Sequence, residues 1–156
     1  MIAGTGSGCG KTTVTLAVLR AMQRKNIPLA AFKCGPDYID PMFHKAVLGI
    51  PSRNLDLFFI SEREVRGQIV RSIPQNGLGV IEGVMGFYDG VSGTTDTASA
   101  AHLARETGTP AILVVRPKGQ SLSLAAMLSG FRNFTENTLC GVVLNGISDA
   151  MYPFYR

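Results

Sequence analysis

The sequence predicts an α/β fold: a doubly wound, mostly parallel sheet with helices on both faces. Five short apolar segments alternate with helix-like segments; the apolar ones are residues 2–4, 27–33, 78–84, 110–117 and 139–146. No hairpin signal lies between them, so crossing helices are expected to join parallel strands. A chain of 156 residues fits one domain with a buried core.

The helices are predicted from apolar spacing and from signals at their ends. We expect them at residues 11–24, 41–49, 61–72, 96–108 and 121–131. Pro41 suits a first turn and Gly49 a helix end. Ser61 is followed three residues later by Glu64, which is the pattern of a capping box.

Composition restricts the class of protein. The chain is 46% hydrophobic and 17% charged, which is typical of a globular protein. Its net charge of +4 suits an anionic ligand, but its Lys and Arg residues are scattered, so no nucleic-acid partner is expected. Cys9, Cys34 and Cys140 have no CxxC spacing and indicate neither a disulfide framework nor a zinc site. A membrane-spanning helix needs about 18 consecutive apolar residues, and no apolar run in this sequence approaches that length. We therefore expect a cytoplasmic protein with no membrane partner.

Both ends of the sequence suggest a truncated domain. The first strand has barely three residues before a glycine-rich loop, and residues 149–156 stop without an obvious final element. We therefore expect the chain to be a piece of a longer polypeptide.

The segment "GTGSGCGKTT", residues 4–13, predicts a phosphate-binding loop of the P-loop type. Glycines leave room for backbone amides to converge on phosphate oxygens, Lys11 adds a positive charge, and Thr12 offers a hydroxyl to Mg²⁺. The first glycine lies seven positions before Lys11, one more than in the standard pattern. The expected ligands are ATP and Mg²⁺, and the glycines concerned are Gly4, Gly6, Gly8 and Gly10.

Polar residues lie at and after the ends of the second and third predicted strands, residues 27–33 and 78–84. On a doubly wound sheet these strand ends should meet the glycine loop in one crevice. Glu82 ends a buried apolar strand, where an uncompensated carboxylate costs several kcal/mol. Mg²⁺ held by Thr12, Glu82 and Asp37 would compensate it; pairing of Glu82 with a nearby lysine is the alternative. Lys33, at the end of its strand, either stabilises a transferred phosphate or is a solvated strand-end lysine.

Several polar residues near this crevice have plain structural alternatives. Asp89 precedes Gly90 and fits an ordinary Asp-Gly turn. Tyr38 and Asp40 fit the cap of the following helix, with Asp40 as its N-cap. His44 and His102 are expected to pack or to form hydrogen bonds.

Four motifs together resemble the cobyrinic acid a,c-diamide synthase family, and specifically its N-terminal ATP-binding domain: "GTGSGCGKTTVT", "FKCGPDYIDP", "PSRNLD" and "EGVMGFYDG". That domain is similar to dethiobiotin synthetase. The resemblance implies that residues 1–156 are a P-loop ATP-binding amidoligase domain of dethiobiotin synthetase-like fold.

The resemblance also implies a reaction, cobalamin-biosynthetic amidation of the a and c side-chain carboxylates of cobyrinic acid. ATP would phosphorylate a carboxylate, and ammonia derived from glutamine would displace phosphate from the acyl phosphate. The implied partners are a corrin-type polycarboxylate, a C-terminal glutaminase domain that has no counterpart in this sequence, and a second copy of the chain, since relatives of this fold often pair.

Site residues follow from the resemblance by position. Those implied to bind ATP are Gly6, Ser7, Gly8, Gly10, Lys11, Thr12, Thr13 and, at the adenine edge, Asn145. Those implied around the metal are Thr12, Asp37 and Glu82. Lys33 would steady the transferring phosphate beside Asp37, while Tyr38, Asp40 and Asp89 would orient the macrocycle or handle the intermediate.

Two other functions compete with amidation. A partitioning-type ATPase usually carries a second lysine five positions before the main one, and that position is Gly6 here. The second competing function is that of a dethiobiotin-synthetase-like ligase acting on a small substrate. The segment "GPDYIDP" argues against this function.

Overall fold

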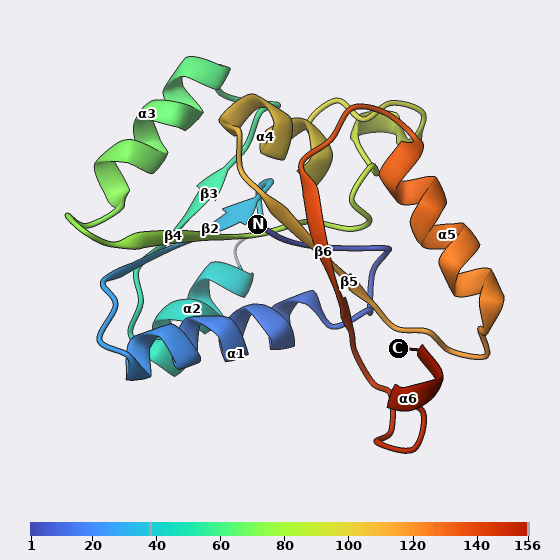
Figure 1. Cartoon of the computed structure of the whole chain (residues 1–156). Helices are drawn as coiled ribbons and strands as arrows, with labels where there is room; N and C mark the ends of the chain where they lie inside the picture. The colour runs from blue at the N-terminus through green and yellow to red at the C-terminus, as the bar shows by residue number, and fades with distance from the viewer. Residues whose placement is uncertain (38, 156) are drawn as a thin grey trace.

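The computed structural model describes residues 1–37 and 39–155 and contains a six-stranded parallel sheet between two layers of helices (Figure 1). The strand order is β3-β2-β4-β1-β5-β6. The strands are β1 (Ile2–Gly4), β2 (Leu29–Cys34), β3 (Ser52–Leu55), β4 (Leu78–Glu82), β5 (Ala111–Val115) and β6 (Leu139–Leu144). The predicted doubly wound α/β fold is confirmed.

Helices cover both faces of the sheet. They are α1 (Lys11–Arg24), α2 (Ile39–Leu48), α3 (Glu62–Ser72), α4 (Ala100–Thr107), α5 (Leu122–Asn133) and α6 (Tyr152–Tyr155), with a 3₁₀ turn at Val91–Gly93. Helices α1 and α2 lie on one face and α3 and α4 on the other, while α5 lies beside β5 and β6 (Figure 1). Among the described residues, no helix has the length and apolar character needed to cross a bilayer.

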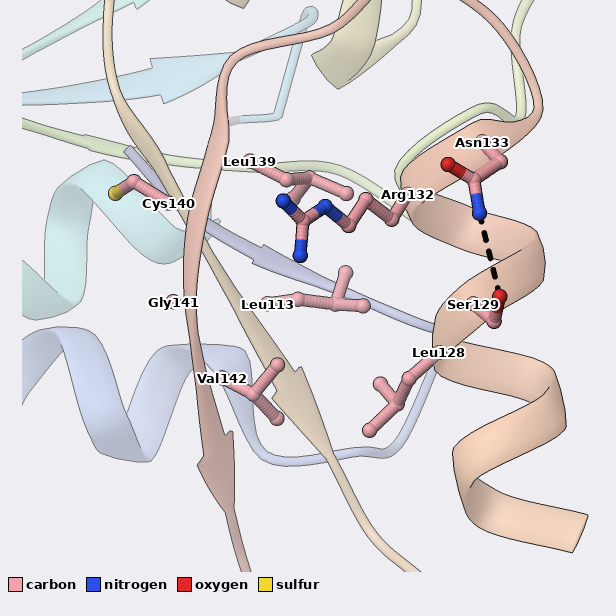
Figure 2. Close-up of a pocket in the computed structure, with 9 residues that line it drawn as sticks. All are labelled: Leu113, Leu128, Ser129, Arg132, Asn133, Leu139, Cys140, Gly141 and Val142. Carbon is pink, nitrogen blue, oxygen red and sulfur yellow. Dashed lines mark hydrogen bonds between the residues drawn. The ribbon is translucent and has the colours of Figure 1, made fainter.

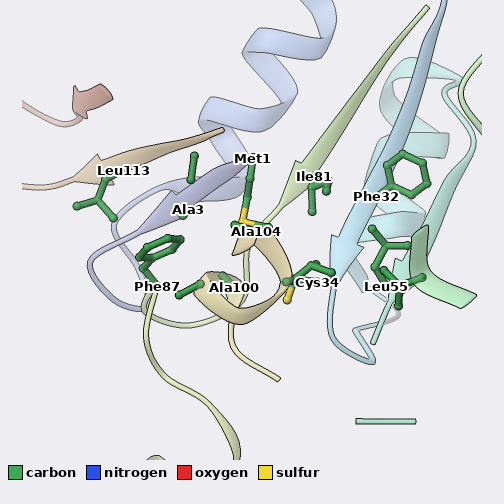
Figure 3. Close-up of a cluster of buried hydrophobic side chains, with 14 of the residues drawn as sticks. Met1, Ala3, Phe32, Cys34, Leu55, Ile81, Phe87, Ala100, Ala104 and Leu113 are labelled. Atoms are coloured by element: carbon green, nitrogen blue, oxygen red, sulfur yellow. The ribbon is translucent and has the colours of Figure 1, made fainter. Parts of the chain in front are cut away.

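Alternation along the strands decides what each face receives. In β2, Phe32 and Cys34 belong to the larger apolar cluster, which also holds Leu55 and Phe87 (Figure 3). Ala31 belongs to the cluster under α1 and α2. Lys33, two residues after Ala31, therefore points to the α1 and α2 side, where the glycine loop enters its helix.

One strand was not predicted. β3 consists of Ser52, Arg53, Asn54 and Leu55, of which only Leu55 is fully buried. It pairs with β2 at the edge of the sheet, so one of its edges has no partner strand among the described residues. Without an apolar run, such a strand gives no local signal.

Two helix starts differ from the predictions. Helix α2 begins at Ile39, whose N–H donates to Oδ1 of Asp37 at 2.9 Å, so Asp40 lies inside the helix and its prediction as N-cap is wrong. Helix α4 begins at Ala100, later than residue 96, because Ser99 caps it by accepting from the His102 N–H.

The capping box at α3 is confirmed. The Glu64 N–H donates to Oγ of Ser61 at 3.3 Å, and the Ser61 N–H donates to Oε2 of Glu64 at 2.9 Å. Here a local pattern sufficed, because both partners lie within one turn.

Candidate functional site

The glycine loop joins β1 to α1 and leaves the first turn of that helix open to an anion. Gly10 precedes the helix with φ 98° and contributes no side-chain cap. A Cβ atom at Gly10 would lie 2.0 Å from Nδ2 of Asn145, so only glycine fits there. The N–H groups at the start of α1 are therefore available for phosphate oxygens, where the helix dipole also favours negative charge.

Lys11 folds back over this loop. Its Nζ atom donates to the carbonyl oxygens of Gly6, at 2.9 Å, and Met85, at 2.6 Å. Burial lowers the pKa of Lys11, and the nearby charge of Lys33 acts in the same direction. The lysine thus connects the glycine loop to the loop that follows β4.

Lys33 and Glu82 lie side by side at the carboxyl ends of neighbouring strands, because β2 and β4 pair in a register that sets one against the other. Lys33 is 3% exposed and Glu82 is fully buried. The Lys33 Nζ atom lies 3.3 Å from Oε1 of Glu82 and 2.5 Å from Oδ2 of Asp40. The lysine that was the predicted alternative partner of Glu82 is therefore present, and it also bonds the Gly83 carbonyl oxygen at 3.0 Å.

Thr12 brings the glycine loop into the same cluster. Its hydroxyl donates to Oε1 of Glu82 at 2.6 Å and lies 3.5 Å from Oδ1 of Asp40. A hydroxyl and two carboxylates, all oxygen donors, thus converge at the start of α1. This donor set fits Mg²⁺, which prefers a few protein oxygens together with phosphate oxygens and water.

Opposing effects set the pKa values of the two buried groups. Burial acts to lower the pKa of Lys33, but the adjoining Asp40 and Glu82 carboxylates outweigh it and raise that pKa. Burial acts to raise the pKa of Glu82, but hydrogen bonds from His44 and Thr12 and the charge of Lys33 lower it. Both groups are therefore charged at neutral pH.

His44 is a site neighbour whose role sequence reasoning missed. The prediction that it packs or forms hydrogen bonds is confirmed: it is fully buried, with Nε2 3.0 Å from Oε2 of Glu82 and Nδ1 2.9 Å from Oγ of Ser52. A signal existed, since His44 follows Asp40 by four positions and both occupy one face of α2.

The glycine loop and the charged cluster of Lys33, Asp40 and Glu82 border a cavity of about 460 Å³. It is lined by Ser7, Gly8, Gly10, Lys11, Thr12, Thr13, Lys33, Asp37, Asp40, Glu82, Val84 and Met85. The structure thus brings most of the predicted phosphate, metal and catalytic residues around one space. Within it, Oδ2 of Asp37 lies 3.8 Å from Nζ of Lys33.

Four predicted site residues do not line this cavity or fall outside the described chain. Gly6 lies in the glycine loop, where its carbonyl oxygen accepts from Nζ of Lys11. The Asp89 carboxylate accepts from the Gly86 N–H at 2.8 Å and closes a turn over residues 86–89, without lining this cavity. Gly90 is extended, so the predicted Asp-Gly turn at residues 89–90 is not formed. Asn145 donates through Nδ2 to the Cys9 carbonyl oxygen at 2.9 Å and so ties the end of β6 to the glycine loop. Tyr38 falls outside the described residues.

A larger cavity, of about 720 Å³, lies between α5 and strands β5 and β6 (Figure 2). Its walls include Leu113, Leu128 and Val142, with Arg132 reaching across from α5. None of the predicted site residues that the structure describes lines it. Chemistry rather than size therefore identifies the glycine-loop cavity as the candidate site.

The parallel sheet, the glycine loop opening α1, and the Lys11 and Thr12 side chains beside Glu82 define a P-loop nucleotide-binding domain. The sequence agrees: residues 1–152 match the CobQ/CobB/MinD/ParA nucleotide binding domain family, and the chain belongs to that family.

Curated relatives carry the name cobyrinate a,c-diamide synthase. The Clostridium tetani protein is 42% identical over 156 residues, covering 100% of this chain and 35% of the relative. The Salmonella typhimurium protein is 45% identical over 158 residues, covering 100% and 34%. The Thermoplasma volcanium protein is 46% identical over 148 residues, covering 95% and 32%. The chain thus spans about a third of the length of these relatives, and the resemblance read from its motifs is confirmed.

Proposed function

We propose that this domain binds ATP and Mg²⁺ and activates carboxylates of a cobyrinic-acid-type macrocycle for amidation. The observation that carries the proposal is the placement of Lys33 beside Asp40 and Glu82, across one cavity from Lys11. Two lysines that line one cavity suit the transfer of a phosphoryl group, whose charge must be stabilised as it moves. The names of the relatives supply the substrate.

The reaction needs activation because a carboxylate does not react with ammonia. A carboxylate oxygen of the substrate attacks the terminal phosphorus of ATP, the bond to ADP breaks, and an acyl phosphate forms. Ammonia then attacks the carbonyl carbon, phosphate leaves with the C–O electron pair, and a proton is lost to give the amide. We propose that the ammonia comes from glutamine, hydrolysed by a part of the longer protein that the relatives possess.

The positions of the side chains support the proposed binding roles. The amides of residues 6–13 and Lys11 would hold the phosphates. Asn145, whose Nδ2 bonds the Cys9 carbonyl oxygen of the glycine loop, would lie at the adenine edge. Thr12, Glu82 and Asp37 would hold Mg²⁺, with Asp40 close to the same hydroxyl. Bound Mg²⁺ would neutralise charge on the phosphate oxygens.

We propose that Lys33 steadies the transferred phosphoryl group. Its charge is held at the carboxyl end of β2 by Asp40 and Glu82 and by the Gly83 carbonyl oxygen. From the resemblance, we propose that Asp40 and Tyr38 orient the macrocycle or the intermediate. Asp89 had the same implied role, but its carboxylate closes a turn outside this cavity.

Calorimetric titration tests this function in two steps. The chain is titrated with a non-hydrolysable ATP analogue and Mg²⁺, and then with cobyrinic acid. We expect both to bind, with Asp40→Ala weakening the second step. Asp149→Ala, which removes an exposed carboxylate far along the chain, is the matched control and should bind as the wild type does.

Nucleotide binding without affinity for cobyrinic acid would contradict the proposed substrate. The assignment as a P-loop nucleotide-binding domain would then be all that remained. Hydroxylamine provides a separate check on the acyl phosphate intermediate, in a protein preparation that catalyses the amidation. It should trap an acyl phosphate as a hydroxamate in a reaction that requires both ATP and the macrocycle.

A further inference from the structure

His44 lies behind the candidate site rather than in it. It projects from α2, is fully buried, and does not line the glycine-loop cavity. Its ring bonds side chains of two strands that flank β2: Nδ1 lies 2.9 Å from Oγ of Ser52 on β3, and Nε2 lies 3.0 Å from Oε2 of Glu82 on β4. It therefore links the edge strand of the sheet to the acidic residue of the site.

The direction of these bonds follows from the chemistry of the partners. An ionised carboxylate only accepts hydrogen bonds, so Nε2 must carry a proton and donate to Glu82. The opposite nitrogen, Nδ1, can then accept from the Ser52 hydroxyl. Both ring nitrogens are used, and the ring orientation is fixed from both ends.

The two oxygens of Glu82 consequently have different tasks. Oε2 receives the bond from His44, whereas Oε1 receives the Thr12 hydroxyl at 2.6 Å and lies 3.3 Å from Nζ of Lys33. Within residues 1–37 and 39–155, His44 is the hydrogen-bond partner found for Oε2. Without it, that buried oxygen would lack a donor and the carboxylate could rotate away from Thr12.

We propose that His44 is a positioning residue that fixes the rotation of the Glu82 carboxylate, so that Oε1 faces the Mg²⁺ bound with the nucleotide. This inference rests on the proposed Mg²⁺ and ATP site, and it adds a residue that neither the motifs nor the cavity walls single out. Bonds of this kind orient metal ligands in many proteins, and their loss costs about 10- to 100-fold in metal affinity. Ser52 supports the arrangement from β3.

The test measures the dependence of nucleotide affinity on Mg²⁺ concentration, by calorimetry with a non-hydrolysable ATP analogue. His44→Leu keeps a similar volume and removes both bonds; we expect its half-saturating Mg²⁺ concentration to rise about 10- to 100-fold. Its affinity for the nucleotide without Mg²⁺ should stay close to that of the wild type, because the glycine loop is unchanged. His44→Gln can still donate where Nε2 stood and should restore most of the Mg²⁺ affinity.

Two comparisons separate positioning from loss of structure. His102→Leu makes the same substitution at a histidine outside the site and should leave the Mg²⁺ dependence unaltered. In a Glu82→Gln background, His44→Leu should add little further loss, since it acts through that carboxylate. If His44→Leu does not fold, His44→Gln and Ser52→Ala carry the test. The double variant His44→Gln with Ser52→Ala should then lose more Mg²⁺ affinity than either single variant.

Wild-type Mg²⁺ dependence in His44→Leu, or equal defects in the Leu and Gln variants, would overturn the inference. A wild-type chain that binds nucleotide without any Mg²⁺ dependence would overturn it together with the metal site. A chain that binds Mg²⁺ and nucleotide but not cobyrinic acid would contradict only the proposed substrate.

Discussion

The Nζ atom of Lys33 lies 2.5 Å from Oδ2 of Asp40, joining the end of β2 to the first turn of α2. The same ammonium lies 3.3 Å from Oε1 of the fully buried Glu82. One cation thus compensates two carboxylates within the candidate site. Removing the Lys33 ammonium should leave the carboxylates of Asp40 and Glu82 without this cation and therefore more able to bind another one.

Lys33→Met is therefore expected to destabilise the fold by about 3–5 kcal/mol, because it breaks a buried ion pair from one side only. Urea unfolding measures the loss. Mg²⁺ should raise the melting temperature of the variant more than that of the wild type, since the freed carboxylates can bind it. Equal effects of Mg²⁺ on both proteins would contradict this reading of the cluster.

Gly10→Ala should weaken nucleotide binding by about tenfold or more, equivalent to about 1.4 kcal/mol. The residue has φ 98°, and a Cβ would lie 2.0 Å from Nδ2 of Asn145, whose bond to Cys9 shapes the loop. Gly130→Ala in α5 is the control: no atom lies within 4 Å of its added Cβ, and helix propensity predicts a gain of up to about 1 kcal/mol. Calorimetry and thermal unfolding measure both effects, and undiminished binding by Gly10→Ala would refute the account of the loop.

Leu55→Ala should cost about 2–5 kcal/mol of unfolding free energy, because Leu55 is fully buried in the core behind β3. Leu122→Ala makes the same change at a side chain that is 83% exposed and should stay within about 0.5 kcal/mol of the wild type. Denaturant unfolding compares them. Similar small losses in both variants would mean that β3 is not a firm part of the sheet.

The cysteines should differ in reactivity. Burial raises the pKa of Cys34 from 9.0 to about 12, whereas Cys140 is exposed. Alkylation of the native protein near pH 8, followed by mass spectrometry, should label Cys140 first and Cys34 only after unfolding. Early labelling of Cys34 would contradict the burial.

The same pKa shift predicts a pH dependence of stability. Between pH 9 and about 12 the unfolded chain loses the Cys34 proton and the folded chain keeps it. Stability should therefore fall as pH rises through this window, with a slope of at most about 1.4 kcal/mol per pH unit from this thiol. Cys34→Ala removes this contribution, so its unfolding free energy should decline less steeply than that of the wild type.

Local patterns in the sequence determined the class of fold and the phosphate loop. Apolar runs indicated five of the six strands, and the glycines before Lys11 and Thr12 indicated the loop and the start of α1. The capping box at Ser61 lies within one helical turn. In each case the interacting groups are near neighbours in the chain, so spacing alone carries the information.

Only the tertiary structure decided which polar groups meet. Lys33 and Glu82 lie 49 positions apart, and the parallel register of β2 with β4 brings them together. The sequence placed Asp37 at the metal and Asp40 with the substrate, yet the start of α2 at Ile39 turns Asp40 toward Thr12. The bonds of His44 depend on the edge strand β3, whose polar residues gave no signal. Contacts of this kind follow from strand order and helix phase, which the whole sheet fixes by burying its apolar faces together.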